Sequence, residues 1–543
     1  MVRFLPLLSL YFFLCCHASW AQTTTATVLG TVKDSSGAVL IGAKVTLRNL
    51  ETGFTRQVTT DPFGAYFIAY VPSGSYRLTV ESPGFRTEVR DGLRFEVGQE
   101  VTIEFVLKLP ELQESITVGG DVAPVEVTKS VLDWMVTREQ IDDLPLNGRQ
   151  ASTLAALAPG VYPTGNPEEP VSAGGQPRGS GEILFDGVSG EGRGLNSFRA
   201  DVPPDAIQEF QVLVSQFPAE FGQSSGLILN TVTRSGANQL HGRGYYFHRD
   251  DALDARNAFA LTRAAFEQKQ MGGWLGGPIV KDQAHFFVAY EGTRRTTIAT
   301  VTSPAGPGDF PQPFDNNQLL VKLDYQLNSS NSFTGRFSLD RPFFHNQYVG
   351  GIVLEEVGVD ALQEDRSYVA SWSRLISNRS LNELRFQFAD AWYQGDTKNP
   401  EAYTIYRPSS ISGKFNNLPL EIYENRTQLV ENLSLERGRH HFKLGFDLNH
   451  IASGGFHYVD NPGSYVFVTD QPFNPIDPDT FPILFVANFG DVNSAFTSNG
   501  YSGFAQDSWH VTPNLTLNLG LRFHEKAYQC QGQLGGRSRF LLG

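Results

Sequence analysis

The sequence predicts a chain dominated by β-structure and built in three parts: a small β-sandwich, an α+β domain and a partial antiparallel transmembrane β-barrel. The 543 residues are too many for one ordinary globular domain. The 53 glycines, the 12% aromatic residues and the low count of 3 methionines suit strands and turns better than long helices. Several long stretches alternate apolar and polar residues, which is the pattern of strands in a membrane barrel.

The N-terminus predicts export. A positive charge precedes an apolar run over residues 5–16, so we expect a signal peptide at 1–21, cleaved between Ala21 and Gln22. A membrane anchor is the alternative, but the run is too short to cross about 30 Å of hydrocarbon as a helix. Cleavage leaves Cys530 as the one cysteine, which excludes an internal disulfide and a cysteine cluster for zinc.

Residues 22–109 predict the β-sandwich. Turn sequences at 34–37, 61–64 and 72–74 separate short runs rich in β-forming residues. Between the last two turns, we expect Tyr66, Ile68 and Tyr70 to lie on one face of a strand. Turns at this spacing are typical of a sandwich, although any small all-β domain would show them.

Three motifs in this region resemble the carboxypeptidase regulatory-like domain family: Gly30-Thr31-Val32-x-Asp34, Gly42-Ala43-x-Val45 and Thr60-Asp61-x-x-Gly64-x-Tyr66. The resemblance implies a transthyretin-like or immunoglobulin-like sandwich that is similar to carbohydrate-binding folds. It implies neither peptidase activity nor sugar binding, because function resides in particular sites and not in a fold.

Residues 110–129 read as a linker, with prolines, a glycine pair and charges. A short extended segment within it resembles the TonB box of TonB-dependent receptors, and its residues are Ser115, Ile116, Thr117 and Val118. The resemblance implies that this segment pairs with an edge strand of TonB. Such β-augmentation relies on backbone hydrogen bonds and demands little of the sequence, so an ordinary linker strand is the alternative.

Residues 130–235 resemble the plug domain of the same receptors. A helix-like run ends at Pro159-Gly160, a helical start is expected at 204–206, and strands are expected at 211–214 and 227–232. Ile183 and Phe185 should face one way before a turn. The candidate plug-motif residues are Leu144, Pro145, Leu146, Asn147, Gly148, Arg149, Asp186 and Gly187.

Residues 236–543 predict the barrel. Apolar side chains occupy every second position in the runs 319–327, 333–339, 384–388, 442–448 and 515–523. Polar or charged residues and two glycines, Gly445 and Gly520, fill the positions between them, with Leu320 as an exception. A soluble sandwich would also alternate, but it explains less well several strands of membrane length, about 9–11 residues. Segments 241–257, 272–295 and 503–523 resemble barrel segments of Oar-like TonB-dependent receptors.

The barrel region departs from that family at its end. Barrels of this kind close with about twenty-two strands, whereas residues 240–530 supply roughly a dozen if each needs about ten residues and a turn. The alternation stops after Phe523. We therefore expect an incomplete barrel and a truncated or frame-shifted copy of a longer receptor.

No motif in the sequence predicts a catalytic residue, a cofactor or a metal site. Residues 222–226 match the nucleophile elbow G-x-S-x-G, but a strand is expected after them where the elbow needs a helix. His440 and His441 should face opposite sides of a strand, and a solvated turn is favoured over a metal site. The acidic run at 460–480 fits no known calcium loop, so a solvated outer loop is favoured.

The resemblance implies an outer-membrane receptor of a Gram-negative bacterium, energised by TonB, ExbB and ExbD, that takes up a large solute such as an iron chelate or an oligosaccharide. The net charge of −14 argues against a nucleic-acid partner. The partners expected are therefore the energising complex, outer-membrane lipid and an unknown external ligand. One alternative is a surface adhesin whose sandwich binds glycan, and another is a soluble secreted binding protein.

Overall fold

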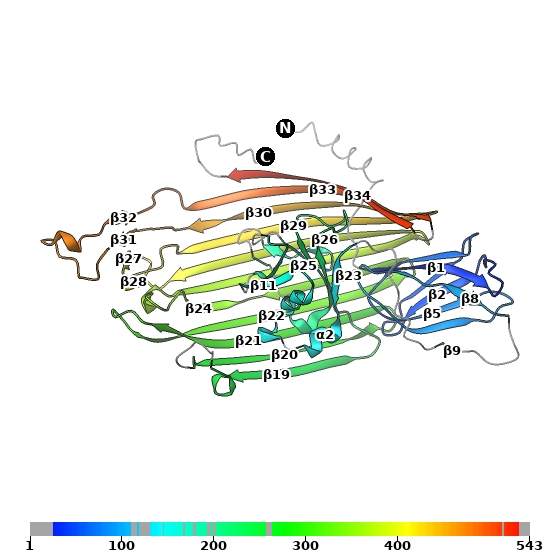
Figure 1. The fold of residues 1–543 in the computed structure, drawn as a ribbon, viewed down its shortest axis with the longest axis horizontal. Coiled ribbons are helices and arrows are strands. Elements are labelled where there is room, and N and C mark those ends of the chain that lie inside the picture. The colour runs from blue at the N-terminus through cyan, green and yellow to red at the C-terminus, as the bar shows by residue number, and fades with distance from the viewer. Residues whose placement is uncertain are drawn as a thin grey trace.

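The computed structural model describes residues 25–109, 117–118, 131–144, 146–166, 169–176, 181–192, 197–198, 202–256, 263–512 and 515–531. These residues form the sandwich, a mixed domain inside a curved sheet, and the sheet itself (Figure 1). The fold class predicted from the sequence is therefore confirmed. Among the described residues, no helix combines the length and the apolar character needed to span a bilayer.

The sandwich consists of two sheets that enclose one apolar core. One sheet has the order β4-β1-β7 with β8 also pairing with β1, and the other has the order β3-β2-β5-β6-β9. The strands are β1 (Ala26–Asp34), β2 (Lys44–Asn49), β3 (Thr55–Thr59), β4 (Ala65–Val71), β5 (Gly74–Glu81), β6 (Glu88–Phe95), β7 (Glu100–Thr102), β8 (Phe105–Leu107) and β9 (Thr117–Val118).

Packing of the sandwich requires a glycine at Gly30, the first residue of the first sequence motif. A Cβ atom at Gly30 would lie 1.9 Å from the carbonyl oxygen of Ile103, on backbone that cannot move aside. Gly30 sits in β1, where β7 and β8 both approach it in parallel. Only glycine therefore permits this close approach of backbones.

Strand β4 departs from the expected alternation at one residue. Tyr66 and Ile68 lie in the sandwich core as predicted, but Tyr70 does not, and Val71 takes the next core position. The register of β4 against β1 shifts there, and Tyr70 has a left-handed φ of 57°. Such a bulge moves the following side chain to the opposite face. The prediction for Tyr70 was therefore wrong.

The mixed domain is built on a five-stranded sheet of order β10-β17-β18-β13-β14. Its pairs are antiparallel apart from β13 with β18. Its elements are β10 (Asp133–Val136), α2 (Arg138–Asp143), η1 (Asn147–Arg149), η2 (Ala151–Leu157), β11 (Val161–Asn166), β12 (Glu169–Ala173), β13 (Glu182–Phe185), β14 (Val188–Ser189), β15 (Glu191–Gly192), β16 (Ser197–Phe198), η3 (Pro204–Ala206), β17 (Ile207–Val214) and β18 (Leu227–Thr233).

The large sheet has twelve strands, all paired antiparallel. Its path runs β19-β20-β21-β22-β23-β25-β26-β29-β30-β33-β34, and β24 bridges β22 and β25. The strands are β19 (His241–Asp250), β20 (Phe266–Val280), β21 (Ala284–Val301), β22 (Gly308–Asn328), β23 (Asn331–Asp340), β24 (Phe343–Gln347), β25 (Val359–Ser377), β26 (Ser380–Thr397), β29 (Leu420–Arg437), β30 (His440–His457), β33 (Asn493–Thr512) and β34 (Leu515–Gln531).

The two faces of this sheet differ as a barrel wall requires. In β26, Phe386 and Phe388 are 44% and 39% exposed, whereas Glu383 and Arg385 are 1% and 3% exposed. The outward face is thus apolar, and the inward face buries charge against the mixed domain. Leu320, the exception in the alternation, faces inward and packs with Phe287 in the apolar core of the mixed domain.

The last strand continues past the point where the sequence loses its alternation. Strand β34 extends to Gln531 and stays paired with β33 up to the match of Ala495 with Gln531. Backbone hydrogen bonds alone maintain such a pairing, and they do not require apolar residues at alternate positions. The prediction that the strand pattern ends at Phe523 was therefore wrong. Within the described residues, β19 and β34 each pair along one edge.

The two ends of the barrel strands carry different structures. At one end, two-residue turns at 329–330, 378–379 and 438–439 join neighbouring strands, and the sandwich lies beside this end (Figure 1). At the opposite end, the long connections 398–419 and 458–492 form a separate sheet of order β28-β27-β31-β32. Its strands are β27 (Thr404–Arg407), β28 (Ser410–Ser412), β31 (Ser464–Val466) and β32 (Leu484–Val486), and the short helices of this end are η4 (Asp251–Leu253), η5 (Glu355–Val357) and η6 (Pro478–Thr480).

Candidate functional site

The mixed domain is held inside the barrel wall by two charged clusters, and the first centres on Asp186. Asp186 and Gly187 form the two-residue turn between β13 and β14, and both have positive φ angles of 51° and 80°. That conformation is the type I′ hairpin turn, which favours Asp-Gly. The turn directs the Asp186 carboxylate at the inner wall of the barrel.

We define Asp186, Thr233, Lys322 and Arg336 as the aspartate cluster. Arg336 Nη1 lies 2.8 Å from Asp186 Oδ2, and Lys322 Nζ lies 3.6 Å from Oδ1. The backbone N–H and the hydroxyl of Thr233 donate to the same carboxylate at 2.9 and 2.7 Å. Lys322 also donates to the Thr233 carbonyl at 2.9 Å. Both cations belong to the barrel wall, so the cluster joins the two bodies.

The electrostatics of this cluster favour a charged Asp186. Burial by itself raises the pKa of Asp186, but Lys322 and Arg336, with the hydrogen bonds from Thr233, hold that pKa well below its usual range. The two cations are 7% and 3% exposed, so each depends on the carboxylate for compensation. The cluster is therefore stable only while its members stay together.

The second connection, the arginine cluster, consists of Arg149, Asp205, Glu291, Tyr245 and Phe247. Arg149 forms ion pairs with Asp205 of the mixed domain and with Glu291 of the barrel, the latter at 2.8 Å. Its guanidinium lies 4.6 Å from the Tyr245 ring centre and 5.0 Å from that of Phe247. The Tyr245 hydroxyl donates to Glu291 at 2.6 Å. Arginine suits this position because it pairs and stacks at once.

Further polar contacts cross this interface, beside apolar contacts in which Phe287, Ala289 and Leu320 of the wall join the core of the mixed domain. Ser189 receives a hydrogen bond on its carbonyl from Gln387 and donates its N–H to Gln428, both at 3.0 Å. Glu220 lies 3.0 Å from Lys443 of the wall. The polar contacts can be replaced by contacts with water when one body shifts, whereas the close-packed apolar contacts cannot.

The sandwich docks on the short-turn end of the barrel through its β4 strand. Phe67 and Ala69, on the face opposite the sandwich core, pack with Leu381. The Phe67 ring meets His441 edge-on at 5.4 Å. Asp61 pairs with Arg379 of a barrel turn at 2.9 Å. Both faces of β4 are buried, which explains its nearly continuous apolar sequence.

The sandwich also touches the mixed domain, at a buried carboxyl group. The Val97 N–H donates to Glu209 Oε1 at 2.7 Å, and Arg94 pairs with Glu139 beside it. Burial raises the pKa of Glu209 to about 7. A cavity of about 560 Å³ lies next to this seam, between Gly98, Phe217 and Lys443. The three bodies therefore meet at one seam with a titratable group in it.

This seam should loosen as the pH rises. An exposed glutamate has a pKa near 4.5, so docking is fully favoured below pH 4.5 and loses that contribution as the pH rises through 7. The stabilising free energy of docking falls by roughly 3 kcal/mol, because the pKa differs between 4.5 and about 7 and each pKa unit corresponds to about 1.4 kcal/mol. Hydrogen exchange of the Val97 amide in the full chain, measured between pH 5 and 8 and corrected for intrinsic rate, should report it.

Two variants check the source of that pH dependence. Glu209→Gln keeps a hydrogen-bond acceptor but cannot ionise, so its corrected exchange profile should be flat. Glu139→Gln lies at the same seam but is well exposed, and it should keep the slope. A slope that persists in Glu209→Gln would assign the titration to another group.

The structure places the other candidate residues as follows. Thr117 and Val118 form β9, which pairs in parallel with Val89 and Arg90 of β6 at the edge of the sandwich. Gly148 contributes its carbonyl to Gln270 of the wall at 3.4 Å. Leu146 packs against the core of the mixed domain, Leu144 is exposed, and Asn147 begins η1. Ala21, Gln22, Ser115, Ile116 and Pro145 lie outside the described residues.

Sequence reasoning missed the barrel partners of Asp186 and Arg149. Lys322, Arg336 and Glu291 are ordinary polar positions of alternating strands, and nothing local distinguishes them. One signal was present: a lysine or glutamate that keeps the inward phase of a barrel strand must find a partner in the lumen.

Two motifs considered for chemistry have structural roles. His440 faces outward, 2.7 Å from Asp507, and His441 faces the sandwich, so the two rings lie on opposite sides as expected. The expectation of a solvated turn for His441 was wrong, because docking of the sandwich buries it. Ser224 of the G-x-S-x-G sequence donates to the Leu227 carbonyl at 2.8 Å, and strand β18 follows directly.

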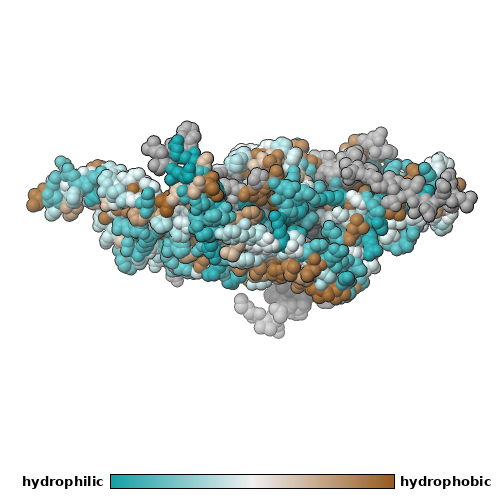
Figure 2. Space-filling view, turned by 90° about the horizontal axis from the view of Figure 1, so that it is seen from below, coloured by the Kyte–Doolittle hydropathy of each residue, from teal (hydrophilic) through white to brown (hydrophobic). Residues whose placement is uncertain are grey.

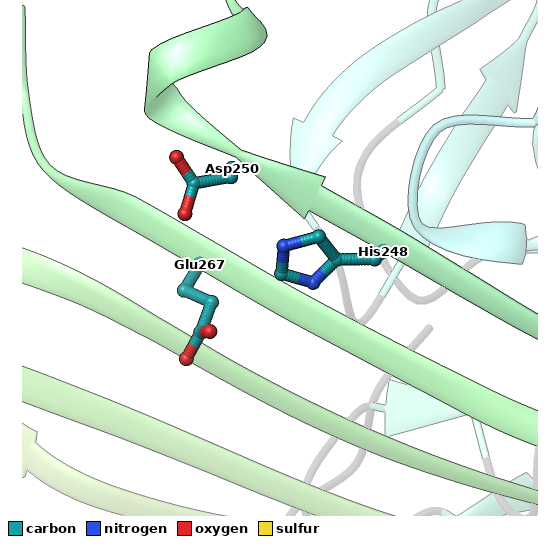
Figure 3. Close-up of side chains that lie close together, drawn as sticks. All are labelled: His248, Asp250 and Glu267. Carbon is teal, nitrogen blue, oxygen red and sulfur yellow. The ribbon is translucent and has the colours of Figure 1, made fainter.

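One group of possible cation ligands lies on the outer wall. Figure 3 shows His248 and Asp250 from β19 beside Glu267 from β20, with ligand atoms within 4.8 Å of one another. Lys269 Nζ already lies 2.7 Å from Glu267, and Asp250 accepts from the Ala252 N–H at 2.8 Å. Both carboxylates thus have partners within the chain, and we assign no ion to this group.

The fold and the charged lumen define a membrane β-barrel that contains a plug domain, with a sandwich at its short-turn end. The chain belongs to the outer membrane β-barrel domain family, which it matches over residues 232–311 and 305–534. Residues 27–108 match the carboxypeptidase regulatory-like domain.

Known relatives are transporters and receptors. The chain is 23% identical to the TonB-dependent transporter Oar of Myxococcus xanthus, over 94% of its own length and 58% of the relative's. It resembles in fold the outer membrane transporter YddB of Escherichia coli, with a TM-score of 0.56 and 12% identity over 74% of this chain and 57% of that one. It also resembles in fold the siderophore receptor PirA of Acinetobacter baumannii, with a TM-score of 0.51 and 18% identity over 74% of this chain and 58% of that one. The predicted architecture of a TonB-dependent receptor is confirmed. The chain spans less than two thirds of the length of each of these proteins.

Proposed function

We propose that the protein is an outer-membrane receptor that takes up a large solute, such as an iron chelate or an oligosaccharide, when TonB with ExbB and ExbD displaces its plug. The observation that carries this proposal is the pair of charged clusters between plug and wall. Buried ion pairs specify one arrangement while both bodies are in place. Because they are polar, they can exchange partners with water and solute during a shift. No covalent chemistry is required.

The orientation in the membrane follows from the ends of the strands. Outer-membrane barrels have short periplasmic turns and longer external loops. The sandwich, docked against the short turns, then lies in the periplasm, after cleavage of the signal peptide between Ala21 and Gln22. A sandwich in that position cannot present a glycan site at the cell surface, so we do not propose the adhesin with an external sandwich.

The segment on which TonB would act is 115–118. Half of it, Thr117 and Val118, already extends along an edge strand of the sandwich, which is the backbone geometry that β-augmentation by TonB would reproduce. TonB would then compete with β6 for this segment and transmit force to the plug through residues 119–130.

Deletion of residues 115–118 should abolish capture of the purified periplasmic domain of TonB by the detergent-solubilised full chain, because the pairing strand is gone. Deletion of 121–124, which removes the same length from the same linker, should leave capture in place. Equal capture by both deletion variants and the unaltered chain would remove the TonB assignment, and capture lost in both would show that linker length decides.

A further inference from the structure

The external end carries a surface that the transport proposal does not use. The connections 398–419 and 458–492 come from different hairpins, yet they form the single sheet β28-β27-β31-β32. β27 pairs in parallel with β31, matching Thr404 with Ser464. The sheet projects beyond the long barrel strands at the left-hand end of Figure 1.

The tip of this sheet is a built structure and not a random loop. Arg407 donates to the carbonyls of Thr469 and Gln471 at 2.9 and 2.7 Å, and its guanidinium lies 4.1 Å from the Phe467 ring centre. Asn474 and Thr480 close the segment between them with hydrogen bonds of 2.8 and 3.1 Å. Residues 467–486 therefore hold a fixed shape against their own sheet.

This fixed tip exposes large apolar side chains. They lie within residues 473–489 and are Phe473, Ile476, Ile483, Leu484, Phe485 and Phe489, which we call the tip patch. Leu484 and Phe485 follow each other in β32, so the tip patch extends over both faces of the sheet. Ile476 and Phe489 are 89% and 93% exposed. Figure 2 shows hydrophobic residues among hydrophilic ones at the left-hand tip. Soluble surfaces rarely gather so many exposed apolar groups unless a partner covers them.

The charge around the tip patch is mainly negative. Arg407 of β27 is an exception, and its guanidinium is engaged by the carbonyls of Thr469 and Gln471. Residues 458–492 contain five aspartates and no lysine, arginine or glutamate. Among the described residues, none of these five carboxylates takes part in a salt bridge. Apolar contacts would supply affinity, and the carboxylates would select a partner of positive charge. An anionic lipid surface would be repelled by the same groups.

We propose that the tip patch is a docking surface for a cationic amphipathic peptide or protein segment. Its apolar face would cover Ile476 and Phe489, and its lysines or arginines would approach Asp470 and Asp479. The site lies outside the lumen, so docking there needs neither plug movement nor TonB. It can deliver or anchor a partner at the cell surface whether or not the chain transports it.

Binding of a labelled amphipathic helical peptide made of leucine and lysine to the full chain in detergent tests this proposal. We expect it to bind at least about tenfold more tightly than a matched peptide of leucine and glutamate. Ile476→Ser and Phe489→Ser should each weaken binding by about tenfold, and Asp479→Asn by a smaller factor. These side chains are almost fully exposed, so their replacement removes little packing from the fold.

The control is Phe63→Ser, which removes an aromatic ring that is 78% exposed from the sandwich at the opposite end. It should bind the leucine–lysine peptide like the unaltered chain. The proposal is overturned if the Ile476→Ser and Phe489→Ser double variant binds the peptide unchanged, or if the acidic peptide binds equally well. It is also overturned if the double variant loses only self-association in sedimentation, since the tip patch would then join two copies of the chain.

Discussion

Replacing Asp186 by alanine should release the first plug hairpin from the barrel wall. The change leaves Lys322 and Arg336 buried without the carboxylate that compensates them. Removing one partner of a buried ion pair costs about 3–5 kcal/mol, most of it the penalty of the stranded charge. The two donors from Thr233 also lose their acceptor.

Hydrogen exchange of β13 and β18 in the full chain measures this effect. A loss of about 3 kcal/mol corresponds to roughly hundredfold faster local opening. The matched control is Asp254→Ala, which also removes an aspartate paired with arginine, at 2.7 Å from Arg249, but in an exposed loop. It should change exchange in the plug by less than a factor of about five, since exposed pairs contribute about 0–1 kcal/mol. Equal exchange in the two variants would show that the aspartate cluster does not hold the plug.

Replacing Arg149 by methionine should have an effect of similar size on the other side of the plug. Asp205 and Glu291 are 4% and 3% exposed. Glu291 loses its cation and Asp205 keeps only the more distant Arg138, at 3.4 Å, and Arg243, while the methionine fills much of the volume. The stacking on Tyr245 and Phe247 is also lost. We expect the local stability of the plug to fall by about 3–5 kcal/mol. Limited proteolysis should then cleave within residues 138–158 while the rest of the full chain stays folded.

Two further variants separate charge from geometry. Arg149→Lys keeps the positive charge but not the planar fork, so its sensitivity should lie between those of the unaltered chain and Arg149→Met. Arg243→Met removes a half-exposed arginine that also approaches Asp205, at 3.9 Å, and it should behave like the unaltered chain. If Arg243→Met is as sensitive as Arg149→Met, then general positive charge and not the arginine cluster stabilises this region.

Together these variants test whether the plug is held by charge. If both predictions hold, a few buried polar contacts carry a large part of the stability of the interface, beside the apolar contacts that Phe287 and Leu320 make with the core of the mixed domain. The polar contacts can exchange partners with water while the plug is displaced, which the close-packed apolar contacts cannot do.

The alternation of single strands was predictable because it is a local property of the chain. Phe386 must lie opposite to Arg385 across the wall wherever that strand is extended. The Asp186-Gly187 turn, the strands on either side of it and the core of the sandwich followed from the same short-range rules. Where the local rule failed, as at Tyr70 and after Phe523, a bulge or a backbone ladder had overridden side-chain preference.

The amino-acid sequence alone determined that this chain is mostly β, that one face of its long strands is apolar, and which short motifs form the turns between its strands. Only the tertiary structure decided that Asp186 meets Arg336, 150 residues away, that β4 docks on a barrel turn, and that two distant loops join in one external sheet. The physical reason is that a side chain's direction follows from its own backbone, whereas its partner depends on the curvature and register of every strand between them.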